Sequence, residues 1–101
     1  MFWRAALLLS LVAAASASMA AEEEGKRLFM GGASPACMLC HALKDAGAEG
    51  AVGPSLDELK PDAARVVKAL KNGIGQMPAY PQLTEAQIQA LARYVEQATR
   101  K

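Results

Sequence analysis

The chain has 101 residues, of which eleven are basic and ten acidic, and 52% of its residues are apolar. This length fits one small domain, and the near balance of charge excludes a basic face for nucleic acid or for an acidic membrane surface. A domain this small often needs a cofactor, a metal or a covalent link to complete a stable core.

The first twenty residues are typical of a Sec-type signal peptide. One basic residue, Arg4, precedes an apolar run over residues 5–15, and small residues follow as far as Ala20. Because this run is too short to span a bilayer, we expect a signal peptide over residues 1–20, a single exported domain over 21–101 and no membrane span after cleavage. An uncleaved N-terminal anchor is the alternative. The mature chain has ten basic and ten acidic residues.

Residues 22–31 are predicted to form the first helix of the mature chain. Three glutamates occupy its first turn, where they favour the positive end of the helix dipole. Gly31 and Gly32 are predicted to end it in the left-handed conformation. Gly25 lies four residues before Phe29 and therefore on the same face. Since a glycine inside a helix costs about 1 kcal/mol relative to alanine, we expect another element to approach closely at Gly25.

Two cysteines and the only histidine of the chain follow: Cys37, Cys40 and His41 form a C-x-x-C-H motif. This spacing is typical of c-type haem attachment. Each thiol can form a thioether with one vinyl group of a single haem, and the histidine then projects towards the iron as an axial ligand. The motif therefore favours one covalently bound haem c.

The alternatives for this motif are a local disulfide, a thioredoxin-like redox pair and part of a zinc site. A zinc site usually needs four ligands, or three and a water, and the chain has no other cysteine or histidine. A thioredoxin-like pair is expected near a βαβ pattern. The lack of any long stretch with period-two alternation instead predicts an all-α fold with three main helices.

Residues 45–56 are rich in glycine and alanine and are predicted to form a loop. Pro54, near its end, has no N–H but keeps a free carbonyl. Two interpretations stand for this residue. Its carbonyl accepts the Nδ1–H of His41, the kind of bond that fixes the tautomer of a ligating histidine, or it belongs to an ordinary turn.

Two further helices are predicted. The first covers residues 61–72, with Pro61 at its first position and Gly73 just past its end. The second begins after Thr84, which forms a capping box with Gln87, and buries a stripe of apolar residues along its length.

The segment 72–81 between these helices contains two glycines, two prolines and Met77, and it has no helical or strand period. If His41 binds a haem iron, Met77 is the expected ligand on the other side. Met38 lies inside the motif and Met30 precedes it, whereas Met77 follows at a distance that lets the chain pass round the ring. A His/Met pair raises the reduction potential and leaves no open position for a substrate, which favours electron transfer over catalysis. Core packing is the alternative role for Met77.

With these motifs in place, the mature chain resembles class I, mitochondrial-type cytochrome c in its short bacterial periplasmic form. The matching residues are Gly25 and Phe29 in the first helix, Cys37, Cys40 and His41 in the attachment motif, residues 53–56 as a Gly-Pro-x-Leu turn, residues 72–78 as the approach to Met77, and Tyr94 in the last helix.

The resemblance implies a helical shell around one covalent haem with an exposed edge, and Pro54 as the carbonyl partner of His41. It also implies a monomer or a transient complex that carries single electrons between periplasmic redox proteins, from a donor dehydrogenase to a terminal oxidase or reductase, without being an enzyme itself. The alternative is a haem subunit or dedicated electron acceptor of one periplasmic dehydrogenase, since the short form is similar to cytochromes that serve sulfite-oxidising enzymes.

The chain departs from the mitochondrial form in two respects: it has no long loop between the motif and Pro54, and no ring of lysines. We therefore expect contact with partners through a small apolar patch that includes Ala36, Met38 and residues beside Met77 rather than through charge.

Overall fold

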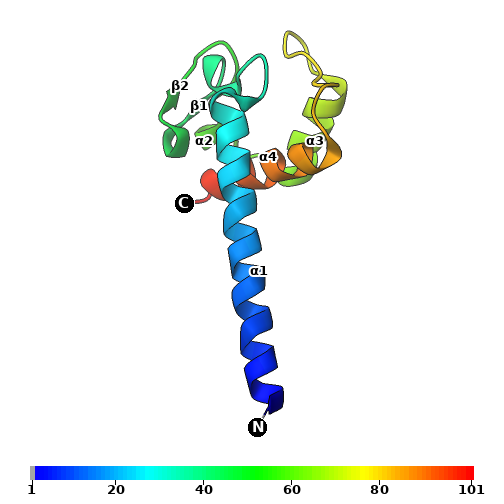
Figure 1. Ribbon diagram of the computed structural model, residues 1–101. Coiled ribbons are helices and arrows are strands. Elements are labelled where there is room, and N and C mark those ends of the chain that lie inside the picture. Colours follow the sequence, from blue (N-terminus) through cyan, green and yellow to red (C-terminus); the bar gives the residue numbers. More distant parts are fainter. Residues whose placement is uncertain (1) are drawn as a thin grey trace.

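A computed structural model describes residues 2–101, with side chains described from residue 15 onward (Figure 1). Within these residues, three main helices, one short helix and a small two-stranded sheet form the fold, which confirms the predicted helical fold with three main helices. The elements in chain order are α1 (Phe2–Arg27), the π-helical η1 (Leu28–Gly32), the 3-10 turn η2 (Cys37–Leu39), β1 (Ala42–Leu43), the 3-10 turn η3 (Lys44–Ala46), β2 (Ala48–Glu49), α2 (Leu56–Leu59), α3 (Ala63–Asn72) and α4 (Glu85–Ala98).

Helix α1 begins well before the residue 22 predicted from the sequence and continues unbroken past Ala20. The predicted signal peptide falls mostly on residues 1–14, whose side chains lie outside those described, so it stays a prediction. Among the described residues, no helix is both long enough and apolar enough to cross a membrane.

The packing of α1 on α4 depends on Gly25. A Cβ atom at this position would come within 2.5 Å of the Cβ of Tyr94 and closer still to the carbonyl oxygen of Ala90. One turn later, Phe29 meets Tyr94 edge-on, with ring centroids 6.1 Å apart and an interplanar angle of 61°, which is a favourable aromatic geometry. The expectation of a close approach at Gly25 is confirmed.

The ends of two helices differ from the prediction. Helix α1 passes into the π turn of η1, and the chain leaves it at Gly31 with φ of 167°, so the predicted left-handed glycine is wrong. Helix α3 begins at Ala63 and not at Pro61, because the Asp62 carboxylate accepts a hydrogen bond of 2.8 Å from the backbone N–H of Arg65 and caps the helix.

The capping box that begins α4 is confirmed. The N–H of Gln87 donates to the hydroxyl of Thr84 at 3.1 Å, and the N–H of Thr84 donates to the side-chain oxygen of Gln87 at 2.9 Å. Three unpredicted elements lie between the motif and α3. They are the short helix α2 and the two-residue strands β1 and β2, which pair antiparallel with Ala42 opposite Glu49.

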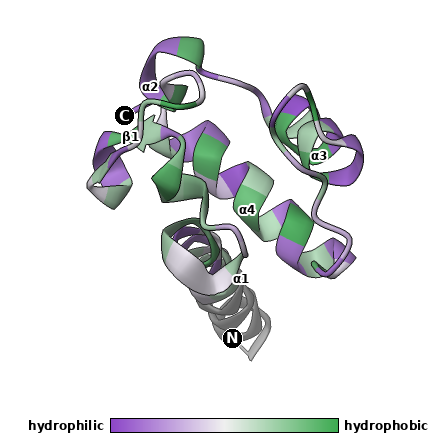
Figure 2. Ribbon diagram, turned by 90° about the horizontal axis from the view of Figure 1, so that it is seen from above, coloured by the Kyte–Doolittle hydropathy of each residue, from purple (hydrophilic) through white to green (hydrophobic). Residues whose placement is uncertain are grey.

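Viewed from above, α4 crosses the middle of the fold, and α1, α2 and α3 lie around it (Figure 2). The apolar stripe predicted for α4 is buried, and it forms one core with residues from η1, β1 and α3. The largest fully buried side chains are Leu28, Phe29, Leu43, Leu70, Leu91 and Tyr94.

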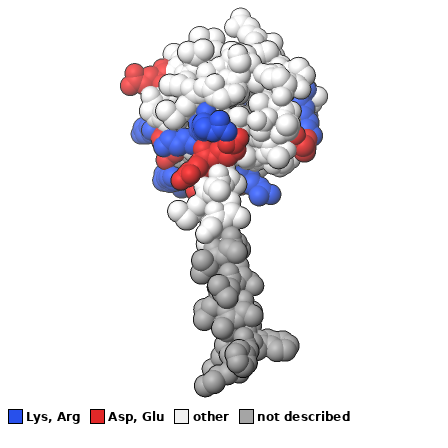
Figure 3. Space-filling model, in the orientation of Figure 1, with Lys and Arg blue, Asp and Glu red and all other residues white. Residues whose placement is uncertain are grey.

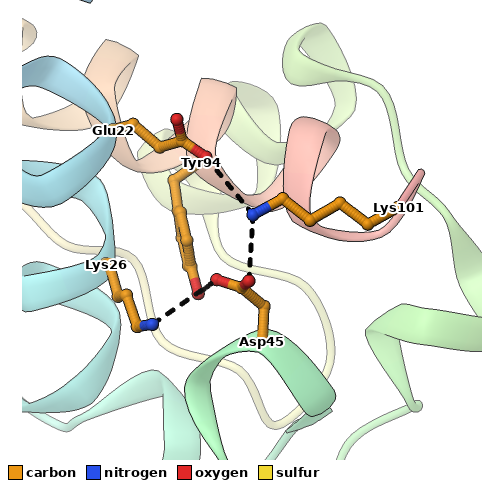
Figure 4. A network of polar contacts seen from close by, with 5 residues as sticks. All are labelled: Glu22, Lys26, Asp45, Tyr94 and Lys101. Atoms are coloured by element: carbon orange, nitrogen blue, oxygen red, sulfur yellow. Dashed lines mark hydrogen bonds and ion pairs between the residues drawn. The ribbon is translucent and has the colours of Figure 1, made fainter. Parts of the chain in front are cut away.

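A polar network joins the second half of α1 and the C-terminus to η3 (Figure 4). The Tyr94 hydroxyl donates to Asp45 at 2.7 Å, and Lys101 donates to the same carboxylate at 3.0 Å. Lys26 lies 3.7 Å from Asp45, and Lys101 also pairs with Glu22 at 3.6 Å. The hydrogen bond from Tyr94, followed by that from Lys101, lowers the pKa of Asp45.

This lowered pKa makes stability depend on pH. The folded state favours ionised Asp45, so its contribution is full above the unfolded pKa of about 3.9 and is lost as the pH falls through the lower folded value. We expect Asp45→Asn, which keeps an acceptor for Tyr94 but removes the charge, to lose less unfolding free energy between about pH 5 and pH 3 than the unsubstituted protein. Urea unfolding of the protein at a series of pH values measures this. The exposed Glu49→Gln is the control, and equal pH dependence in Asp45→Asn and the unsubstituted protein would contradict the role of Asp45.

Candidate functional site

A cavity of about 620 Å³ lies between α4, the C-x-x-C-H segment and the segment that carries Met77. It brings together every site residue predicted from the sequence. Most of its lining is apolar, as is typical of a site for a large apolar cofactor. The residues that matter for its chemistry are Cys37, Cys40, His41, Gly53, Pro54, Arg65, Gln76, Met77 and Tyr80, and Phe29, Leu91 and Val95 contribute from the core.

The motif folds as a tight turn that presents His41. The N–H of His41 donates to the carbonyl of Cys37 at 3.0 Å, and its ring Nδ1 lies 2.8 Å from the carbonyl oxygen of Pro54. Because this carbonyl can only accept, Nδ1 is the donor, and in the neutral imidazole the lone pair is then on Nε2. The imidazole is thereby fixed in the tautomer that a metal ligand requires.

Glycine is needed where the loop after β2 packs on this turn. A Cβ at Gly53 would come within 2.6 Å of Cε1 of His41 and 2.9 Å of its Nδ1, and a Cβ at Gly50 would come within 2.6 Å of the carbonyl carbon of Cys40. The N–H of Gly53 also donates to the carbonyl of Cys40 at 2.7 Å. The glycine-rich composition of this loop thus serves close packing against the motif.

Cys37 and Cys40 do not pair as a disulfide, and both line the cavity. Burial raises the pKa of the Cys37 thiol to about 11, whereas redox-active C-x-x-C pairs have a lowered thiol pKa. In the part of the chain with described side chains, no group of three or more His, Cys, Asp and Glu residues is placed to bind a metal ion. The local chemistry therefore differs from that of a thioredoxin-like pair.

Met77 is half-buried and lines the cavity from a compact turn. The N–H of Met77 donates to the carbonyl of Ile74 at 2.9 Å, and the N–H of Ile74 donates back to the carbonyl of Met77 at 3.0 Å. Gly73 and Gly75 have φ of 70° and 55°, a region that favours glycine. These two glycines explain why the segment has no helical or strand period.

Sequence reasoning missed the role of Tyr80. Its side chain is only 4% exposed, and its hydroxyl donates to the carbonyl of Pro35 at 2.7 Å. Burial raises the pKa of this hydroxyl to about 12, so it is a protonated donor at neutral pH. Its only sequence signal is an aromatic residue in an otherwise irregular segment.

Comparison with known proteins identifies the class of site. Residues 20–95 match the family model described as cytochrome c oxidase, cbb3-type, subunit III. The chain belongs to the cytochrome c family. The c-type cytochrome SorU from Sinorhizobium meliloti is 49% identical, with a TM-score of 0.80 over 82% of this chain and 95% of that chain. The comparison with curated proteins found no match.

Membership of this family, together with the likeness to a c-type cytochrome, means that the protein carries covalently bound haem c, and its size fits one haem. The residues present fit this group. The cavity is largely apolar, both cysteines line it, and so does the only histidine, whose Nδ1 is bonded to a carbonyl. Cytochromes c carry electrons, and the site has the composition that this activity needs.

The packing of Gly53 against His41 gives a test of the site. We expect Gly53→Ala to displace the imidazole, because the added methyl group would lie within 2.6 Å of the ring. Overpacking of this kind costs about 1–3 kcal/mol of stability. Haem content and the visible spectrum of the purified protein report the displacement, and urea unfolding reports the stability. The nearby Ala51→Ser, at an exposed residue that does not line the cavity, is the control. A normal spectrum and normal stability in Gly53→Ala would contradict this packing.

Proposed function

We propose that this cytochrome c is a periplasmic one-electron carrier whose single haem is bound through thioethers to Cys37 and Cys40, with His41 and Met77 as axial ligands of the iron. The observation that carries the proposal is that His41 and Met77, 36 residues apart in sequence, line the same apolar cavity as both thiols. The haem supplies a reversible one-electron couple, and the protein determines its potential and its access to partners.

Each proposed ligand has a separate task. Pro54 holds the Nδ1 proton of His41 and so directs Nε2 towards the iron. The thioether of Met77 is a soft ligand that favours the reduced state and raises the potential. With both axial positions taken by side chains, no position is left for a substrate, and this supports electron transfer in place of catalysis.

The proposed periplasmic location rests on the N-terminal sequence. Residues 1–20 have the short basic start, apolar run and small-residue end of a Sec-type signal peptide. Export places the chain in the compartment where haem c is attached. The proposed mature domain, residues 21–101, covers nearly all of the family match.

The proposed contact surface for redox partners is apolar. Leu39, Val52 and Ile74 are exposed to 66%, 73% and 68%, and Val52 and Ile74 also line the cavity. Ala36 and Met38, which were expected in this patch, are only partly exposed. Leu39 is therefore the most exposed apolar residue of the motif. In the face shown in Figure 3, charged side chains gather near the base of the folded part and most of the upper part is uncharged. This distribution supports docking with little electrostatic steering.

The ligand assignment is tested by Met77→Ala. We expect loss of the weak methionine–iron absorption band in the red, binding of carbon monoxide to the reduced protein, and a fall in potential by a sizeable part of the roughly 0.8 V range that axial ligands span. Met30→Ala, at an exposed methionine on η1, should leave all three unchanged. If the unsubstituted reduced protein binds carbon monoxide readily at neutral pH, Met77 is not the ligand, and a purified sample without a Soret band would rule out haem attachment.

Two roles remain for this electron carrier. It is either a free carrier, or a haem subunit or dedicated acceptor of one periplasmic dehydrogenase, for example a sulfite-oxidising enzyme. The apolar patch is small, which is typical of transient redox encounters, so we expect the cytochrome to elute as a monomer when a periplasmic extract is separated by size under native conditions. Co-elution of the Soret absorbance with a large oxidoreductase at low and at high salt would favour the subunit instead.

A further inference from the structure

The segment that carries Met77 is bonded closely to α3. The paired bonds between Ile74 and Met77 close its turn, and the N–H of Tyr80 donates to the carbonyl of Leu70 at 2.8 Å. A Cβ at Gly73 would lie 2.9 Å from the carbonyl oxygen of Met77. The turn and the end of α3 therefore form one unit on the Met77 side of the cavity.

Two hydrogen bonds join this unit to the segment just before the attachment motif. The hydroxyl of Tyr80 donates to the carbonyl of Pro35 at 2.7 Å, and the side-chain amide of Gln82 donates to the carbonyl of Ser34 at 2.7 Å. Among the hydrogen bonds between described residues, these are the two that link residues 73–83 to residues 33–54. The buried ring of Tyr80 also lines the cavity.

The Tyr80 hydroxyl donates its one proton to a backbone carbonyl, so it cannot donate that proton to the cofactor as well. Among nearby polar side chains, Lys71 pairs with Glu85 at 2.9 Å, whereas Arg65 and Gln76 line the cavity. The bond of Tyr80 instead connects two stretches of backbone that each lead directly to a proposed attachment or ligand residue.

We propose that Tyr80, assisted by Gln82, is a positioning residue that sets the distance between the Met77 turn and the Cys37–His41 segment and thereby strengthens the bond from Met77 to the iron. This inference rests on the proposed function, because it requires Met77 to be a ligand. The carbonyl of Pro35 lies two residues before Cys37, so loss of the bond frees the Met77 turn to move relative to the haem attached there.

The test is competition by imidazole for the ferric iron of the holoprotein at neutral pH, followed by loss of the methionine–iron band. Tyr80→Phe removes one hydrogen bond and should thereby weaken the competing bond from Met77 to the iron. We expect imidazole to bind to Tyr80→Phe roughly two- to tenfold more tightly than to the unsubstituted protein, which corresponds to the net free energy of one hydrogen bond. Gln82→Ala should shift the affinity in the same direction by less, because its side chain is exposed.

Tyr94→Phe is the matched control. It removes a hydroxyl that also donates at 2.7 Å, to Asp45, from a buried tyrosine that does not line the cavity. We expect it to lower the urea midpoint of unfolding without changing the affinity for imidazole. Gln89→Ala, which removes a side-chain bond to Glu85 on α4, is the control for Gln82→Ala.

The outcomes separate this inference from the ligand assignment. Unchanged imidazole affinity in Tyr80→Phe, or an equal gain in Tyr94→Phe, would overturn the positioning role while Met77 stayed a ligand. Absence of the methionine–iron band in the unsubstituted protein would overturn the ligand assignment and this inference together. If Tyr80→Phe yields no holoprotein, the imidazole affinity of Gln82→Ala is the test. An affinity equal to that of the unsubstituted protein would then refute the proposal.

Discussion

At Gly25 the backbone of α1 comes so close to α4 that no side chain fits between them. Such an approach fixes both the distance and the crossing point of the two helices, because neither backbone can move inward. It places Phe29 against Tyr94 and directs η1 towards the attachment motif. The neighbouring face of α4, at Leu91 and Val95, forms part of the cavity wall.

The cavity explains how a small chain supports this fold. A domain of about 80 residues buries a modest fraction of its surface, and here a space of about 620 Å³ lies among its core residues. Haem c supplies the apolar volume that the side chains do not, and its covalent attachment keeps that volume with the protein. Core and functional site are consequently the same region, so residues such as Phe29 and Leu91 contribute to both.

The features that the sequence predicted well are those with local signals. Three features have signals that lie within a few residues of the structure they predict. They are the C-x-x-C-H motif, the capping box of Thr84 and Gln87, and the glycine at position 25, which is costly inside a helix. The short helix α2 and the paired strands β1 and β2 lack such signals, because two to four residues show no period. The start of α3 was misplaced because Pro61 and Asp62 both suit a helix start, and the carboxylate of Asp62 is the group that caps it.

The two proposed iron ligands also differ in how local their supporting contacts are. His41 is held by contacts within its own part of the chain: the turn of its motif, the carbonyl of Pro54 and the close face of Gly53. Met77 is held by a turn that, among the described residues, has two side-chain hydrogen bonds, through Tyr80 and Gln82, to the motif side of the cavity. A histidine ligand can therefore be read from a pentapeptide, whereas the setting of the methionine depends on residues more than forty positions apart. Axial ligands and the hydrogen bonds around them tune the potential of a haem, and on the Met77 side these bonds join segments far apart in the sequence, which sequence patterns reveal least.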